Sequence, residues 1–141
     1  MDPAFLRSSG WTPREADGFS ATIAPYWYRG EGGNLEIGFG VKEEHCNGRA
    51  TLHGGALMTF ADIALGSAAA AALGHVRCVT AHLQAYFVSA ARVGDFLACR
   101  PEVVRRTSQM VFVRGLIKVG EKTIASGDGI WKVLGGEPEG V

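Results

Sequence analysis

The longest apolar stretch of the chain begins at residue 56 and has the period of a helix. Small and apolar side chains recur there at helical spacing, at Ala56, Leu57, Phe60, Ala61, Ala64, Leu65 and Ala68. Gly74 follows them as a residue that commonly ends helices. About 18 residues of helix would be about 27 Å long. Because the remaining positions are mostly apolar too, we expect this helix to be buried on all sides.

The other apolar positions follow the period of β-strands. Residues 35–41 alternate apolar side chains with Glu36 and two glycines, which is typical of a half-buried strand. An aromatic run before them predicts another strand, and a glycine-rich turn separates the two. After the helix, the chain reads as strands almost to its end, over residues 79–88, 95–106, 109–119 and 122–134. A tight turn at Gly120 and Glu121 joins the last two.

One long buried helix with about five or six antiparallel strands indicates an α+β fold. The apolar character of the helix on all its faces favours a sheet that curls around it over a helix lying flat on an open sheet. We expect a domain over residues 18–134, an arm or short helix over residues 1–17, and a flexible tail over residues 135–141.

Composition narrows the class of protein. The chain has 141 residues, is 47% apolar and 20% charged, and carries no net charge, which indicates a soluble domain without a nucleic-acid or membrane partner. Three cysteines without a C-x-x-C pair favour a reducing, cytoplasmic compartment. The N-terminus lacks the pattern of a signal peptide. Polar residues interrupt the apolar helix, so we do not expect it to span a membrane.

The predicted helix contains a single acid, Asp62, among apolar neighbours. A carboxylate in such a segment needs partners, and its pKa is open to tuning, as in acid–base catalysts and nucleophiles. A structural hydrogen-bond acceptor is the alternative for a lone helical Asp.

His53, Gly54 and Gly55 stand where this helix begins. Two glycines there expose backbone N–H groups that can bind an oxyanion, whereas turn geometry alone is the alternative. His53 and Asp62 are nine residues apart, about 900° of helix or a net half turn. Asp62 therefore points away from His53, and two antiparallel helices of a two-fold dimer would bring Asp62 of one chain to Gly54 of the other.

The loop before the helix contains His45, Cys46 and Asn47. Asn47 and the following glycine form a strong turn dipeptide, and the functional alternative for His45 and Asn47 is to position a substrate carbonyl or an attacking water. Cys46 is a poor nucleophile candidate, because adjacent residues of an extended loop point to opposite sides and His45 could not serve as its base. These residues and His53 lack the spacing of a metal site, and we expect no metal.

Residues 45–64, HCNGRATLHGGALMTFADIA, resemble the motif of hotdog-fold acyl-CoA thioesterases of the 4-hydroxybenzoyl-CoA and phenylacetate-pathway type. That motif runs roughly H-x-N-x-x-G-x-x-HGG, with an acid seven residues after the second glycine. The resemblance extends from about Gly18 to Leu134. It implies a curled antiparallel sheet around a central helix, a homodimer or homotetramer with the site between two subunits, and hydrolysis of an acyl-CoA to free acid and CoA. No cofactor is implied beyond the CoA of the substrate.

The resemblance also implies roles for single residues. Asp62 matches the catalytic carboxylate, a general base or nucleophile. Gly54 matches the residue whose backbone N–H polarises the thioester carbonyl. His53 and Asn47 match residues that orient substrate or water, and Thr80 matches a hydroxyl that holds the water beside the acid. Gly55 and His45 are further candidates for substrate binding in this segment.

Two departures from the motif and one charge bias add further expectations. Ala50 stands where the family often has glycine, which would alter the loop bend. His82 replaces a common acid two residues after Thr80, so we expect it on the same strand face, near the acyl pocket or the interface. Residues 92–118 carry six basic and two acidic side chains. Arg105 and Arg106 in that region are candidates for the phosphates of CoA, with solvated turn arginines as the alternative.

Two other functions stay open at this point. A hotdog acyl-thioester dehydratase or hydratase would use the same helix, although the chain lacks the F-P-G signature typical of the dehydratases. A non-catalytic acyl-CoA-binding module would share the fold, although the presence of Asp62, Asn47 and the H-G-G sequence argues against it.

Overall fold

The computed structural model describes residues 1–74 and 77–135. Its two α-helices are α1 (Pro3–Ser8) and α2 (Gly54–Leu73). Its strands are β1 (Thr12–Arg14), β2 (Tyr26–Arg29), β3 (Glu36–Gly40), β4 (Cys78–Phe87), β5 (Phe96–Cys99), β6 (Glu102–Arg106), β7 (Met110–Val119) and β8 (Lys122–Val133). Three short 3₁₀ segments are η1 (Gly18–Ile23), η2 (Gly32–Asn34) and η3 (Glu43–His45). Residues 136–141 of the expected tail lie outside the described residues.

The predicted central helix is α2, which has 20 residues and ends as expected at Gly74, in the left-handed conformation with φ 72°. Its fully buried positions form one face, at Leu57, Phe60, Ala61, Ala64, Leu65, Ala68, Ala69 and Leu73. Most of the other positions are half-buried. The expectation of burial on all sides is therefore wrong for a single chain, because the sheet covers one side of the helix. By length and composition α2 could also cross a membrane, but in this fold it is the core helix.

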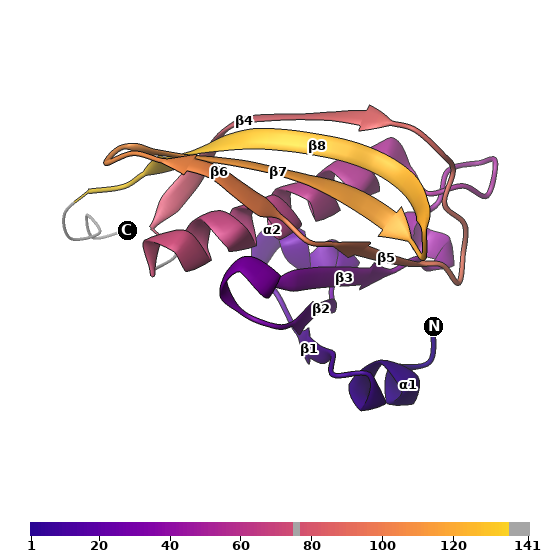
Figure 1. The fold of residues 1–141 in the computed structure, drawn as a ribbon. Coiled ribbons are helices and arrows are strands. Elements are labelled where there is room, and N and C mark those ends of the chain that lie inside the picture. The colour runs from indigo at the N-terminus through magenta and orange to yellow at the C-terminus, as the bar shows by residue number, and fades with distance from the viewer. Residues whose placement is uncertain (75–76, 136–141) are drawn as a thin grey trace.

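An eight-stranded antiparallel sheet curls around α2 (Figure 1). The strand order is β1-β2-β3-β5-β7-β8-β4, with β6 paired to β7 beside that path. The α+β class and the curled sheet are confirmed. The single strand predicted over 95–106 is wrong, since Pro101 separates β5 from β6. Proline has no N–H for a sheet and interrupts the pairing.

The N-terminal segment forms a second, smaller core on the sheet face away from α2. Leu6 of α1, Trp11 and Trp27 are buried together there, and Phe96 and Ala98 pack against them. Strand β1, which the sequence did not predict, extends the sheet by pairing with β2.

Strand β4 forms one end of the sheet. It pairs with β8 on one side and, within the described residues, with no strand on the other (Figure 1). Several apolar side chains at and just after this edge are exposed, namely Val79, Tyr86, Phe87 and Val88. An exposed apolar edge strand is a template for pairing with another chain.

Candidate active site

The structure brings Asp62 of α2 and Thr80 of β4 together. The Thr80 hydroxyl donates a hydrogen bond of 2.6 Å to Asp62 Oδ1. Asp62 is half-buried and Thr80 is exposed, so the pair stands at the open edge of the sheet and not in its core. A short bond to a carboxylate holds the acid in one orientation while its second oxygen remains open to a ligand.

His82 does not share the face of Thr80, contrary to our expectation. Thr80 pairs with the buried Trp131 of β8, and His82 pairs with Ile130, so the register shifts between them. Paired residues share a face, and adjacent residues of β8 point to opposite faces. His82 therefore points to the side away from α2. The reason is a β-bulge at Ala81, an extra residue that reverses the alternation.

Of the two glycine N–H groups at the N-terminus of α2, one is available for a ligand, whereas the sequence suggested two. His53 is the N-cap, and its Nδ1 accepts a hydrogen bond of 2.8 Å from the Gly55 backbone N–H. Because Nδ1 is an acceptor, the proton of the neutral imidazole lies on Nε2. The Gly55 N–H is thus occupied, whereas the Gly54 N–H has no hydrogen-bond partner among residues 1–74 and 77–135.

The ring of Phe87, at the end of β4, lies against Gly54. A Cβ added at Gly54 would lie 3.2 Å from Phe87 Cε2. The sequence reasoning passed over Phe87, although an aromatic residue at the exposed edge of a predicted strand was a visible signal. The Phe87 ring therefore bounds the space beside Gly54 on one side.

Asn47 organises the loop that precedes α2. Its Oδ1 accepts from the Arg49 N–H at 2.8 Å, and its Nδ2 donates to Thr51 Oγ1 at 2.9 Å. Ala50 in this loop adopts a left-handed φ of 59°, a conformation that favours glycine. One Nδ2 proton of Asn47 remains for a ligand.

His45 connects this loop to the helix start. It is 5% exposed, its Nδ1 accepts from the Lys42 N–H at 3.0 Å, and its carbonyl accepts from the His53 N–H at 2.9 Å. Burial lowers the pKa of His45, the positive charge of Lys42 lowers it further, and Glu44 opposes the shift. Cys46 Sγ contacts the carbonyl of Lys42 at 3.5 Å, which gives it no base.

Two hollows flank the H-G-G segment. The first, which we call the Gly54 hollow, has a volume of about 430 Å³ and contains Gly54, Asn47 and Phe87 in its wall. The second has a volume of about 370 Å³ and is lined by Gly55, His45 and His53, among others. Only the first combines the unpaired Gly54 N–H with the side chain of Asn47.

Arg105 and Arg106 lie at the opposite end of α2. Arg106 Nη1 donates a hydrogen bond of 2.8 Å to the carbonyl of Ala72, in the last turn of the helix. A helix of 20 residues separates its ends by about 30 Å. The structure therefore does not bring these two arginines to Gly54 of the same chain.

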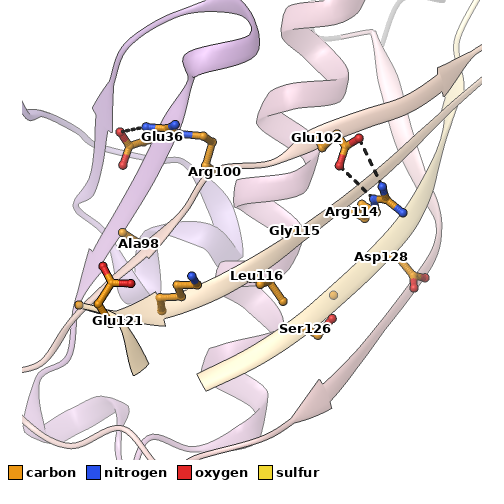
Figure 2. A pocket seen from close by; sticks show the side chains of 13 residues that line it. Glu36, Ala98, Arg100, Glu102, Arg114, Gly115, Leu116, Glu121, Ser126 and Asp128 are labelled. Atoms are coloured by element: carbon orange, nitrogen blue, oxygen red, sulfur yellow. Dashed lines mark hydrogen bonds and ion pairs between the residues drawn. The ribbon is translucent and has the colours of Figure 1, made fainter. Parts of the chain in front are cut away.

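A third hollow, of about 790 Å³, is larger than these two and contains none of the predicted site residues (Figure 2). It lies on the sheet face away from α2, and its two arginines are paired with acids. Arg100 pairs with Glu36 at 3.0 Å, and Arg114 pairs with Glu102 at 3.0 Å. The remaining charged residues of its lining are Lys118, Glu121 and Asp128, so acids outnumber cations and the hollow offers little attraction to an anion. Within residues 1–74 and 77–135, no group of His, Cys, Asp and Glu is arranged to hold a metal.

The chain is similar in sequence to known proteins. A family model described as the thioesterase superfamily matches residues 50–125, from the end of the loop into β8. A Pseudomonas aeruginosa protein named "Putative esterase PA0474" is 36% identical over 98 residues, which cover 69% of this chain and 73% of that protein.

Solved structures share the fold. The PaaI protein of the Escherichia coli phenylacetic acid degradation operon has a TM-score of 0.67 at 20% identity, over 96% of this chain and 87% of its own. The BH2602 protein of Bacillus halodurans, solved with CoA, has a TM-score of 0.64 at 26% identity, over 70% of this chain and 66% of its own.

Proposed function

Because the chain belongs to the thioesterase superfamily and is a thioester hydrolase, we propose that it hydrolyses acyl-CoA to the free acid and CoA. The observation that carries this proposal is the unpaired Gly54 N–H at the edge of a hollow that also contains Asn47. The resemblance of residues 45–64 to acyl-CoA thioesterases and the relative solved with CoA support the substrate class.

In this proposal, each residue of the candidate site has one role in the reaction. The Gly54 N–H donates to the thioester oxygen as negative charge develops on it, which stabilises the tetrahedral intermediate. Asp62, oriented by Thr80, removes a proton from water or attacks the carbonyl carbon itself. The C–S bond then breaks, and the CoA thiolate leaves and takes up a proton. If water attacked, the free acid forms directly. If Asp62 attacked, water then hydrolyses the acyl–Asp62 anhydride, which releases the free acid and restores the carboxylate. The spare Nδ2 proton of Asn47 orients the carbonyl or the water.

The carboxylate and the oxyanion donor come from different chains in this proposal. Gly54 and Asp62 of one chain are eight residues apart on α2, about 12 Å along its axis. That separation is too large for both to act on one carbonyl. Each site therefore needs Asp62 of the partner subunit.

The open edge of β4 supports this arrangement. Asp62 bonds to Thr80 near the start of the strand, and Gly54 lies against Phe87 at its end. Antiparallel pairing of two β4 edges, with the two-fold axis between Leu83 and Gln84, would bring the partner's Thr80 opposite Phe87. The exposed apolar side chains of the edge would be buried in the same contact.

The hydrolysis is tested by CoA release from short, medium, long and aryl acyl-CoAs. We expect turnover by the wild type and a loss of at least about 10² in kcat for Asp62→Asn. Asp128→Asn is the matched control, because this carboxylate binds Gln84 on the face away from α2. Near-normal kinetics of Asp62→Asn would contradict the mechanism. Conversion of 3-hydroxyacyl-CoA to enoyl-CoA without CoA release would favour the dehydratase.

The shared site is tested by mixing two inactive variants. Gly54→Pro removes the N–H donor, and Asp62→Asn removes the acid. After subunit exchange, each mixed dimer has one intact site, so we expect recovery of up to about a quarter of wild-type activity. Absence of recovery, with exchange verified by mass spectrometry, would place both groups in one chain.

A further inference from the structure

The indole of Trp131, in β8, is a neighbour of the carboxylate in the candidate active site. Trp131 pairs with Thr80 of β4, and the side chains of such a pair stand on one face of the sheet, about 5 Å apart. Thr80 in turn donates its hydroxyl hydrogen bond to Asp62. Trp131 is only 3% exposed. A large buried ring therefore borders the Asp62–Thr80 pair, and the hydrolysis described above gives it no role.

Two glycines leave room for the indole of Trp131 and fix the direction of its nitrogen. A Cβ added at Gly129 of β8 would lie 2.7 Å from Cη2 and Cζ3, so the six-membered ring lies over that glycine. A Cβ added at Gly66 of α2 would lie 3.1 Å from Nε1, so the nitrogen edge faces the helix. Gly66 follows Asp62 by four residues, and residues four apart are neighbours on one helix face. The indole nitrogen therefore lies beside the helix face that carries the acid.

The N–H group of this indole is unpaired. Within residues 1–74 and 77–135, Trp131 Nε1 has no hydrogen-bond partner. Every side-chain N or O atom that is closed off from solvent in that part of the chain does have a partner, so the unpaired nitrogen is reached by solvent. The indole N–H can only donate, and a buried tryptophan usually has a partner for it. A buried ring whose donor opens beside Asp62 is suited to bind an acceptor atom of a ligand.

We propose that the Trp131 N–H binds an oxygen atom of the acyl group, so that the enzyme prefers acyl-CoA esters oxygenated at the third carbon. This inference rests on the proposed function. Hydrolysis brings the thioester carbon to the Asp62 carboxylate, and Gly66 lies about 6 Å farther along the helix axis. An acyl chain that extends in this direction brings a substituent on about its third carbon within hydrogen-bonding distance of Nε1.

The donor-only character of the indole N–H determines which acyl groups the site distinguishes. A hydroxyl or carbonyl oxygen at that place accepts the hydrogen bond. A plain hydrocarbon chain would instead cover the N–H and exclude water from it, which leaves a buried donor unpaired at a cost in binding. Trp131 is thus a specificity-determining residue that discriminates by one oxygen atom.

The test compares kcat/KM for CoA release from a 3-hydroxyacyl-CoA and from the plain acyl-CoA of the same chain length. We expect the wild type to prefer the 3-hydroxy ester by about tenfold, the value of one hydrogen bond. Trp131→Phe keeps an aromatic ring without the N–H and should reduce this ratio to about one. Because both esters are measured on the same variant, any loss of folded protein cancels in the ratio. The matched control is Trp27→Phe in the second core, which should leave the ratio unchanged.

A spectroscopic measurement gives a second test that keeps Trp131 in place. The chain has three tryptophans, whose indole N–H signals are followed by ¹H–¹⁵N NMR in Asp62→Asn and assigned with Trp11→Phe and Trp27→Phe. The 3-hydroxyacyl-CoA should shift the Trp131 indole proton downfield, whereas the plain acyl-CoA should not. An unchanged Trp131 signal with the 3-hydroxy ester bound would overturn the inference.

The kinetic outcomes separate this inference from the proposed function. Equal kcat/KM for the two esters, a preference for the plain ester, or hydrolysis of aryl esters alone would overturn the inference and leave the hydrolase intact. A preference for the 3-hydroxy ester that persists in Trp131→Phe would assign the oxygen to another donor and would also overturn it. Absence of CoA release from every ester would refute the proposed function itself.

Discussion

The two ends of α2 differ in whether the backbone groups left over by the helix find hydrogen-bond partners. At the C-terminal end, the carbonyls of Ala71 and Ala72 accept hydrogen bonds from the Gly74 N–H and the Arg106 guanidinium. At the N-terminal end, the His53 imidazole binds one N–H, and the Gly54 N–H is left without a partner in the described chain. The helix dipole favours anions at that end. A helix end whose donor stays unpaired beside a hollow is suited to bind a ligand.

The cations near the two ends of α2 also differ, in a way that the sequence alone does not show. Arg106 completes the C-terminal end of the helix, so its charge is already used within the fold. Near the N-terminal end, the exposed residues Arg49, Arg92 and Lys122 form no ion pair within the described residues. Variants at the two ends of α2 and in the loop before it test this contrast.

Removing the N–H donor at the N-terminal end should have the largest effect. Gly54→Pro deletes that donor and adds a side chain next to Phe87, and proline is well tolerated at the first position of a helix. His53, with φ −64° and ψ 136°, already has the extended conformation that a residue before proline prefers. We expect kcat to fall by about 10²–10³ for the loss of an oxyanion donor, measured with the best acyl-CoA substrate.

Gly54→Ala is the matched control for this variant. It adds the same Cβ next to Phe87 Cε2, at 3.2 Å, but keeps the N–H. The ring is the end of an exposed side chain and can move by a few tenths of an ångström. If Gly54→Ala and Gly54→Pro lose activity equally, space beside Phe87 matters and the donor does not.

Replacing the N-cap should separate a structural role of His53 from a catalytic one. His53→Ala loses the bond to the Gly55 N–H and should lower the free energy of unfolding by about 1 kcal/mol. His53→Asn supplies another good N-cap and should restore most of that stability. Chemical denaturation and kcat are measured for both. If His53→Asn is as stable as the wild type but inactive, the imidazole contributes directly to the reaction.

Removing the cation at the C-terminal end should change stability and not catalysis. Arg106→Ala deletes the hydrogen bond to the Ala72 carbonyl and should cost about 0.5–1 kcal/mol of unfolding free energy. Arg105→Ala is the control, since the neighbouring exposed arginine has no such bond to lose. A rise in KM for acyl-CoA in Arg106→Ala would instead assign this end of the helix to the substrate.

The periodic elements of this fold were predictable, because helix and strand periods are local properties of the sequence. The helix before Gly74 and most strand positions after it followed from spacing alone, although the strand predicted over 95–106 is two strands, β5 and β6. The reversal of His82 did not, since the bulge at Ala81 becomes visible only in the pairing of β4 with β8. A motif in turn predicted Gly54 as the oxyanion donor, whereas the occupation of the Gly55 N–H depends on the side-chain orientation of His53. Such orientations are set by tertiary contacts.

The smallest predicted effect concerns the loop that leads into the N-terminal end. Ala50 has a φ of 59°, a conformation that costs an L-residue about 1–2 kcal/mol. Ala50→Gly relieves this strain but makes the unfolded chain more flexible, which costs about 0.4–1 kcal/mol. We expect a net gain of about 0.5 kcal/mol in the free energy of unfolding, measured by urea denaturation.

Gly48, in the same loop, provides the control for Ala50→Gly. An added Cβ at Gly48 would meet nothing within 4 Å, and its φ lies outside the left-handed region. Gly48→Ala should therefore also stabilise the protein, but only by restricting the unfolded chain. If Ala50→Gly and Gly48→Ala both stabilise the protein, the loop holds Ala50 in a strained conformation. If Ala50→Gly destabilises the chain as an ordinary alanine-to-glycine change does, Ala50 carries no strain, and the loop that positions Asn47 is relaxed.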